Sequence, residues 1–317
     1  MSINADKPHL WKDDVAASVD LFNAWFLKFA PQTFRETRAK TTELVKNALA
    51  SLDNVRSITP DVLRKQPGVL PTLRMSTAPP IARDRLVGLA AVSSNLVSSL
   101  EAGRLPMRMP AAQLDQQLKL ICKTLQRLLD RDLFPWLERA AKPTETELYR
   151  AATIIADRLT GAVADPLIRN AQEQEQLALI GKYLKARGYV QEAPPSGQDL
   201  AKMKPGTFSF RLNVPVAEGE RRVNIPIDVV IQPKKPHPSR LPILVEAKSA
   251  GDFTNTNKRR KEEAQKIHQL RSMYGKEVRF VLFLRGYFDT GYLGYEAAEG
   301  LDWIWEHRID DMLQLGI

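Results

Sequence analysis

Hydrophobic residues in the first half of the chain recur at intervals of three and four, so each series lies on one face of an amphipathic helix. The clearest series are Val15, Val19, Phe22 and Phe26, and later Leu114, Leu118, Ile121, Leu125 and Leu128. We expect residues 13–163 to form helices separated by proline-containing turns. Thr59 should cap one helix that has Pro60 in its first turn, and another helix is expected over residues 81–100.

From about residue 170 the pattern changes. A helix over residues 171–187 should end at Gly188, because glycine accepts the left-handed conformation that closes many helices. Alternating apolar and polar residues then predict strands at 207–216, 222–231, 241–249 and 278–284, with a helix at 258–274. The predicted fold class is α+β (mixed α/β). A helical domain (residues 1–165) precedes a domain (166–317) with a central mixed sheet flanked by helices.

Composition narrows the classes of protein. The 317 residues suffice for two domains, and a single cysteine excludes internal disulfides and cysteine-based zinc clusters. The chain lacks a signal-like start and an apolar run of about 20 residues, so we expect a soluble, cytoplasmic protein without a membrane partner. A net charge of +9 favours a polyanionic partner without specifying one.

The segment PILVEAKS (residues 242–249) combines a strand-like apolar run with two charged residues. Side chains alternate along a strand, so Glu246 and Lys248 should lie on the same face. In the preceding strand Asp228 is the acidic residue, and it should face away from Ile225, Ile227, Val229 and Ile231. If the two strands pair as a hairpin, Asp228 and Glu246 come to lie side by side.

Two neighbouring carboxylates repel each other unless a cation lies between them, and oxygen ligands favour Mg²⁺. We expect Asp228, Glu246 and the Ala247 carbonyl to hold this metal. Lys248 can then position a water molecule or stabilise charge during phosphodiester hydrolysis. The alternative is a strand-end ion pair between Glu246 and Lys248, with Asp228 unrelated to it.

A third catalytic acid can come from the helix over residues 171–187. Glu173 lies four residues before Leu177, the first residue of the apolar stripe, and should therefore face inward. Glu175 is the second choice. For either residue, a solvated glutamate in the first helical turn is the alternative interpretation.

The order of Asp228 and then Glu246-Ala247-Lys248, after a helix that carries Glu173, resembles the PD-(D/E)xK nuclease superfamily. Ile227 stands where the name of the superfamily has proline. Further segments resemble the XamI-type restriction endonucleases: residues 11–14 (WKDD), 82–86 (ARDRL), 254–261 (TNTNKRRK), 286–296 (GYFDTGYLGYE) and 302–308 (DWIWEHR).

This resemblance implies a restriction-endonuclease-like core and a Mg²⁺-dependent type II enzyme that cuts double-stranded DNA at a short palindrome, with GTCGAC as the family-level expectation. It also implies a homodimer, because a two-fold symmetric protein reads a palindrome, and a companion methyltransferase that protects the same site. Asp228, Glu246 and Lys248 carry over as catalytic residues.

The basic segment after the catalytic strand gains a role from the same resemblance. Its polar side chains could reach phosphates or base edges of DNA. The candidate DNA-binding residues are Asn255, Asn257, Lys258, Arg259 and Arg260. The helical domain could contact DNA, support dimerisation or serve packing.

Two other functions fit the same sequence. A recombination or repair nuclease would have the same fold and metal chemistry but would prefer branched or damaged DNA. A non-catalytic basic DNA-binding protein would use the charge without cutting.

Overall fold

The computed structural model describes residues 2–193, 200–218, 221–235, 237, 241–254 and 256–317; for residues 201, 217, 218, 221, 222 and 257–260 it describes the backbone alone. Contacts divide the chain into two compact units. One unit is Ala30–Ile168, and the other combines Met1–Phe29 with Arg169–Ile317. We call them the helical unit and the sheet unit.

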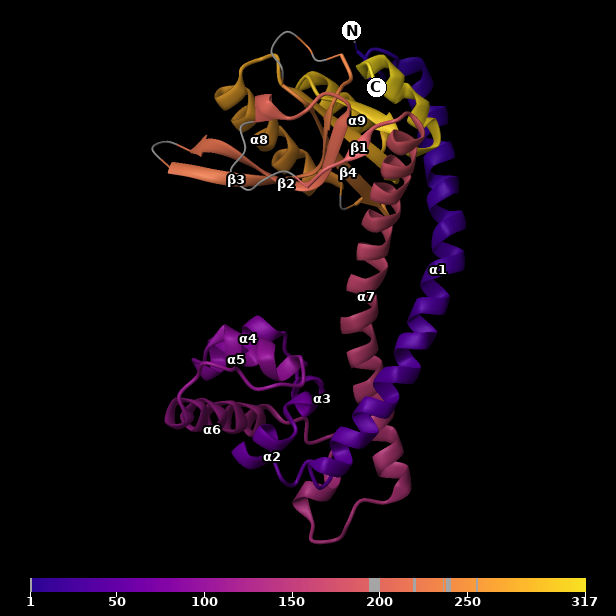
Figure 1. The fold of residues 1–317 in the computed structure, drawn as a ribbon. Helices are drawn as coiled ribbons and strands as arrows, with labels where there is room; N and C mark the ends of the chain where they lie inside the picture. Colours follow the sequence, from indigo (N-terminus) through magenta and orange to yellow (C-terminus); the bar gives the residue numbers. More distant parts are fainter. Residues whose placement is uncertain (1, 194–199, 219–220, 236, 238–240, 255) are drawn as a thin grey trace. The chain divides into compact units, whose positions relative to one another are not determined.

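The helical unit has its own hydrophobic core, which includes Val45, Leu63, Leu118 and Trp136. Its elements are the later part of α1 (Pro8–Ser51), α2 (Pro60–Lys65), η1 (Pro67–Val69), α3 (Leu70–Met75), α4 (Arg83–Ala90), α5 (Ser94–Glu101), α6 (Ala111–Leu128), η2 (Pro135–Glu138) and the first part of α7 (Glu145–Ala186) (Figure 1). The predicted cap at Thr59 is confirmed, because its hydroxyl group accepts a hydrogen bond from the backbone N–H of Val62 at 3.4 Å.

The sheet unit contains a six-stranded sheet in the order β1-β2-β3-β4-β5-β6. The strands are β1 (Val190–Gln191), β2 (Thr207–Glu218), β3 (Arg221–Gln232), β4 (Ile243–Ala250), β5 (Arg279–Gly286) and β6 (Asp302–Trp305). The pairs β2–β3 and β3–β4 are antiparallel, whereas β1–β2, β4–β5 and β5–β6 are parallel. The sheet is therefore mixed, as the sequence predicts. The other elements are η3 (Leu200–Lys202), α8 (Thr256–Tyr274), α9 (Thr290–Ala298) and η4 (Glu306–Leu315).

Two hydrophobic clusters lie between the sheet and the helices that cover it, one cluster on each face. The final turns of α7 pack on one face of the sheet, through Leu177, Ile180 and Leu184. Helices α8 and α9 pack on the other face, through Ile267, Leu270, Tyr292 and Leu293. Strand β4 contributes to both clusters because its side chains alternate between the faces.

The helical prediction needs three corrections. Helix α7 is continuous over 42 residues and does not begin near residue 171. Proline does not end α1 or α7, since Pro31 and Pro166 lie inside them. The helix expected over residues 81–100 is two helices, because Ala91 adopts a left-handed conformation with φ of 51° and ends α4.

The change of pattern near residue 170 marks a change of packing partner and not the start of a helix. Earlier apolar residues of α7, such as Ile155 and Leu159, belong to the core of the helical unit. Later ones, such as Leu177 and Ile180, pack against the sheet. The boundary between the units falls at residues 168 and 169, inside α7. Residues 1–29, which the sequence suggested for the helical domain, group with the sheet unit.

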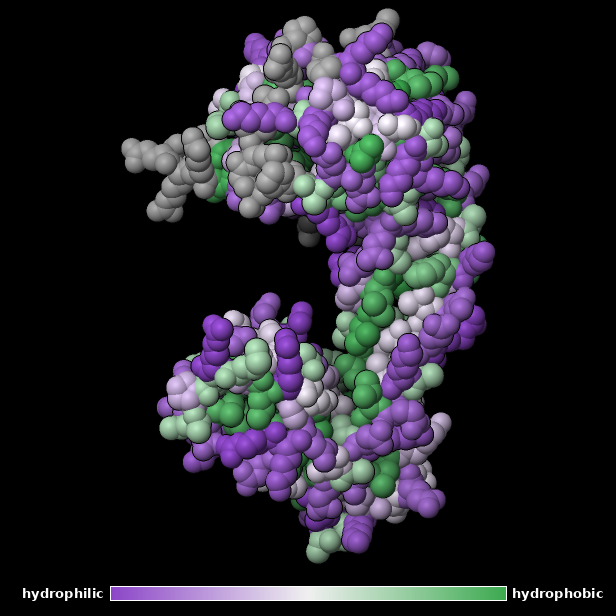
Figure 2. Space-filling model, viewed as in Figure 1, coloured by the Kyte–Doolittle hydropathy of each residue, from purple (hydrophilic) through white to green (hydrophobic). Residues whose placement is uncertain are grey.

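Hydrophilic side chains cover most of the surface visible in Figure 2, with hydrophobic side chains along α7. Val163 and Leu167 of this helix are 39% and 48% exposed. Across the described residues, we find no helix with the length and hydrophobicity that a membrane span requires.

Candidate active site

The candidate site is built where strands β3 and β4 separate. Their ladder consists of Val229 with Val245, Val230 with Leu244, and Ile231 with Ile243. Immediately beyond it, the backbone N–H of Ala247 donates a hydrogen bond to Oδ2 of Asp228 at 2.9 Å. The expected hairpin is confirmed, and this hydrogen bond holds the Asp228 carboxylate beside the end of β4.

The expected alternation along β3 is wrong at Asp228. Ile225 and Ile227 pack in the cluster on the α8 side of the sheet, whereas Val229 and Ile231 pack on the α7 side. Opposite Asp228, between the pairs Phe210–Val229 and Leu212–Ile227, Arg211 has a φ of 52°. This left-handed conformation interrupts the regular pleat, while the register of the ladder is the same on both sides of it.

Glu246 and Lys248 share one face of β4, as predicted, and their charged atoms lie 3.1 Å apart. Helix α8 adds two residues to this pair. Lys266 donates to the same oxygen of Glu246, Oε1, at 2.6 Å. Glu263, which is fully buried, lies 3.4 Å from Nζ of Lys248. The strand-end pair is therefore part of a larger network of alternating charges.

The electrostatics of the network follow from burial. Burial, together with repulsion from Glu246 and to a smaller extent from Glu173, raises the pKa of Asp228 to about 6, although the Ala247 N–H acts in the opposite direction. Burial acts to lower the pKa of Lys248, but the carboxylates of Glu246 and Glu263 outweigh it and the pKa is raised. Lys248 therefore remains an ammonium cation.

A cavity of about 450 Å³ opens beside this network. Its lining residues come from α7, β4 and α8: Arg169, Asn170, Gln172, Glu173, Gln176, Ala247, Lys248, Ser249 and Glu262. Gln176 is buried, and its side-chain N–H₂ donates to the carbonyl of Lys248 at 3.4 Å. The cavity thus places a lysine from the network next to a space that a substrate group can enter.

The structure separates the two candidates for the third acid. Glu173 lines the cavity, and its carboxylate forms an ion pair with Arg211 at 2.8 Å. Glu175 instead pairs with the buried Arg285 at 2.9 Å, in a cluster with Glu306. Of the two, Glu173 is therefore the residue placed with Lys248.

The donor set fits a hard divalent cation. Oε2 of Glu246 is buried and has no hydrogen-bond partner among the described residues. A buried carboxylate oxygen without a donor is stabilised by a cation, and the neighbouring Asp228 supplies a second carboxylate. In the described part of the chain, no three His, Cys, Asp or Glu side chains come together as a metal site. Asp228 and Glu246 are thus the two neighbouring carboxylates that this part of the site presents.

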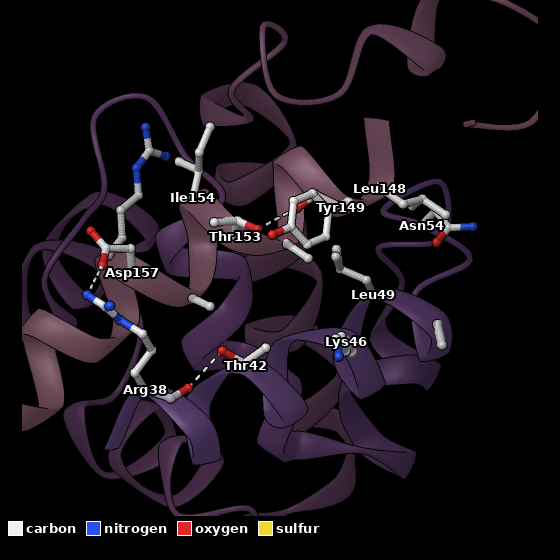
Figure 3. A pocket seen from close by; sticks show the side chains of 14 residues that line it. Arg38, Thr42, Lys46, Leu49, Asn54, Leu148, Tyr149, Thr153, Ile154 and Asp157 are labelled. Carbon is white, nitrogen blue, oxygen red and sulfur yellow. Dashed lines mark hydrogen bonds and ion pairs between the residues drawn. The ribbon is translucent and has the colours of Figure 1, made fainter. Parts of the chain in front are cut away.

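A larger cavity, of about 1020 Å³, lies inside the helical unit between α1 and α7. Figure 3 shows that several of its polar side chains already have partners, either another side chain or a backbone carbonyl. Arg38 pairs with Asp157 at 3.1 Å, and Thr153 donates to the Tyr149 carbonyl. Asp157 is the one carboxylate among the described residues that line it, so this cavity lacks a pair of neighbouring acids.

The proposed DNA-binding residues lie largely outside the described part of the structure. Asn255 is not described, and the side chains of Asn257, Lys258, Arg259 and Arg260 are not described either. The backbone of residues 257–260 forms the start of α8. Their contacts with DNA therefore stay a prediction.

Sequence reasoning missed Glu263, Lys266 and Gln176. A signal for Glu263 was present, because it lies four residues before Ile267 on the buried stripe of its helix. The same spacing from Leu177 had identified Glu173. Lys266 and Gln176 gave no comparable signal, since their roles depend on which strand each helix covers.

A family model for the XamI restriction endonuclease matches residues 53–305. The chain is also 59% identical over 316 residues to the type II restriction enzyme SalI of Streptomyces albus G, with 99% of both chains covered. The chain belongs to the XamI restriction endonuclease family. The expected resemblance is confirmed, and membership of the XamI family makes the chain a type II restriction endonuclease that acts on double-stranded DNA.

Two further comparisons are more distant. The type II restriction enzyme XamI of Xanthomonas campestris pv. amaranthicola is 28% identical over 235 residues, which cover 73% of this chain and 76% of that enzyme. Protein VC1899 of Vibrio cholerae has a solved structure with a TM-score of 0.30 and 14% identity, covering 90% of this chain and 56% of VC1899.

Glu306→Gln tests the cluster that Glu306 forms with Arg285 and Glu175, through the pH dependence of the free energy of unfolding. Burial raises the pKa of Glu306 from an ordinary value of 4.5 to about 7. The folded state therefore holds this proton more tightly than the unfolded chain, and the wild type loses stability as pH rises through this interval. Glutamine does not titrate, so the variant should gain up to roughly 3 kcal/mol relative to wild type between about pH 4.5 and 7.

Chemical denaturation at several pH values measures this difference. The control is Glu43→Gln, which removes an exposed carboxylate paired with Lys46. Its difference from wild type should stay small throughout. A Glu306→Gln difference that does not change between about pH 4.5 and 7 would contradict the prediction.

Proposed function

We propose that this type II enzyme hydrolyses phosphodiester bonds at the end of β4 in a Mg²⁺-dependent reaction, and that its target is the palindrome GTCGAC. The proposed active site is of the PD-(D/E)xK type. The observation that carries the proposal is the convergence of Asp228, Glu246 and Lys248 at one point. The Ala247 N–H holds Asp228, and Lys248 lies 3.1 Å from Glu246 at the edge of a cavity.

Each residue has a distinct task in this proposal. Asp228, Glu246 and the Ala247 carbonyl hold the cation, which when bound supplies a Lewis acid for the phosphoryl group and lowers the pKa of an attacking water. Lys248 orients that water or stabilises the negative charge that grows on the phosphoryl oxygens. The oxygen of water bonds to phosphorus as one P–O bond of the phosphodiester breaks. The attacking water loses a proton to solvent and the leaving oxygen takes one up, so the products are a phosphomonoester and a free hydroxyl end. Glu173 serves as the third acid of the site.

DNA recognition is assigned to the segment that follows the catalytic strand. The backbone of residues 257–260 forms the start of α8, the element that follows β4, and this stretch includes three consecutive cations, Lys258, Arg259 and Arg260. Arginine pairs with guanine and with phosphates, and asparagine pairs with adenine, so Asn255 and Asn257 extend the same surface. A companion methyltransferase would protect the same DNA sequence in the cytoplasm.

Isosteric replacement of the three central residues should abolish cutting. Asp228→Asn and Glu246→Gln remove the charges that attract the cation, and Lys248→Met removes the ammonium group while keeping an unbranched side chain up to Cε. The cleavage rate in Mg²⁺ should fall by about 10²-fold or more for each variant. Conversion of a supercoiled plasmid with one GTCGAC site to its linear form provides the measurement.

Two controls accompany this digest. A plasmid with one base changed in GTCGAC should stay intact, and EDTA should stop cutting by the wild type. If Asp228→Asn cut DNA at the wild-type rate, the assignment of Asp228 to the active site would be wrong. Cutting of the altered plasmid at the same rate would remove the target assignment.

The choice of Glu173 as the third acid is tested against its neighbour Glu175. Glu173→Gln should lower the single-turnover cleavage rate by about tenfold, because it removes charge beside Asp228. Glu175→Gln should lower the melting temperature instead, because it leaves the buried Arg285 with one fewer partner. Equal cleavage rates for Glu173→Gln and wild type would exclude Glu173 from the site.

A homodimer should form, because two symmetric active sites cut the two strands of a palindrome. Sedimentation equilibrium should then give twice the 35.7 kDa mass of one chain at the concentrations that cut DNA. If the wild type were a monomer that cut both strands in one binding event, the proposed homodimer would be excluded.

A further inference from the structure

A fully buried carboxylate lies behind the catalytic lysine. Glu263 of α8 is 0% exposed, and its two oxygens contact different partners. Oε1 lies 3.4 Å from Nζ of Lys248, and Oε2 accepts a hydrogen bond of 2.6 Å from the hydroxyl group of Tyr292. One carboxylate therefore links the candidate active site to helix α9.

Packing alone does not require an acid at this position. Glu263 belongs to the buried side of α8, with Ile267 and Leu270, where an apolar side chain would avoid the cost of removing a carboxylate from water. That cost is several kcal/mol for an ion without partners. The ammonium group of Lys248 and the hydroxyl group of Tyr292 offset it here.

Two carboxylates on different elements contact the same ammonium group. Glu246 approaches Nζ of Lys248 from β4 at 3.1 Å, and Glu263 approaches it from α8 at 3.4 Å. Lysine has a flexible four-carbon chain, so a single partner leaves much of its freedom intact. Attraction to both elements restricts the ammonium group to the space between them, at the edge of the cavity.

Tyr292 holds the second carboxylate oxygen of Glu263. It is 1% exposed, and its ring packs on Phe288 with 4.9 Å between ring centroids. Burial and the neighbouring Glu263 and Glu296 raise the pKa of Tyr292, so its hydroxyl group remains a hydrogen-bond donor. Its hydrogen bond to Oε2 limits rotation of the Glu263 carboxylate and thereby fixes Oε1 toward Lys248.

We propose that Glu263 is a positioning residue for the endonuclease reaction, which holds Lys248 at the reacting phosphate and is itself held by Tyr292. The inference rests on the proposed catalytic role of Lys248. Glu263 touches neither substrate nor cation and acts through the lysine. The competing explanation is a purely structural one, in which Glu263 balances the charge of a buried lysine and affects folding alone.

The experiment compares Glu263→Gln and Tyr292→Phe in the full-length protein. Single-turnover cleavage of a GTCGAC duplex in Mg²⁺ gives the rate of the chemical step, and binding of the same duplex in Ca²⁺ gives DNA affinity. Glu263→Gln should cut about tenfold or more slowly, because small displacements of a catalytic group have large effects on rate. Tyr292→Phe should slow cutting by a smaller factor. DNA affinity should stay within about twofold of wild type for both, since neither residue contacts DNA in this proposal.

Two control variants separate positioning from stability. Tyr274→Phe removes another part-buried hydroxyl, bonded to the Pro215 carbonyl at 2.7 Å on the same helix as Glu263. Glu101→Gln removes a part-buried carboxylate paired with Arg74 at 2.7 Å in the helical unit. Both should lower the melting temperature while leaving the single-turnover rate at saturating DNA close to that of wild type.

The outcomes distinguish this inference from the function on which it rests. If Lys248→Met cuts at the wild-type rate, both the catalytic role of Lys248 and the role of Glu263 are overturned. If Lys248→Met is inactive but Glu263→Gln and Tyr292→Phe cut at the wild-type rate, the positioning role alone is overturned. A loss of melting temperature in these two variants without a loss of rate has the same meaning, because it matches the structural controls.

Discussion

Burial of several carboxylates around the end of one strand is the constraint on which the site depends. Glu246 and Glu263 are buried, and Asp228 lies close enough to Glu246 for repulsion to raise its pKa, because water screens such charges poorly. Lys248 and Lys266 reduce this repulsion, and both contact Glu246. The elements that supply these charges must therefore pack at fixed distances from one another.

The fold meets this constraint by covering both faces of the sheet. Helix α7 packs on one face and contributes Glu173 and Gln176 to the cavity. Helix α8 packs on the other face and contributes Glu263 and Lys266 to the charge network. The ladder between β3 and β4 ends at Val229 and Val245. The Ala247 N–H therefore donates to the side chain of Asp228 and not to a backbone carbonyl of β3. The site is thus a consequence of where a hairpin opens between two helical layers.

Strands are the part of the fold that the sequence predicted best. The four expected strands correspond to β2 to β5, because alternating or continuous apolar runs are local signals. Strands β1 and β6 have two and four residues, too short to give such a signal. Helix α7 was misjudged for a different reason, since its buried stripe faces one core before Ile168 and another after it.

By itself the sequence singled out the candidate residues of the site: Asp228, Glu246 and Lys248 stand out because charged residues interrupt two strand-like apolar runs. It also indicated the family, through short segments across most of the chain. Tertiary structure decided which neighbours complete the site. Glu173 and Glu175 lie two residues apart on α7, but one lines the cavity and the other pairs with Arg285. Local spacing gives the face of a helix, whereas the partner opposite that face is set by the packing of distant segments.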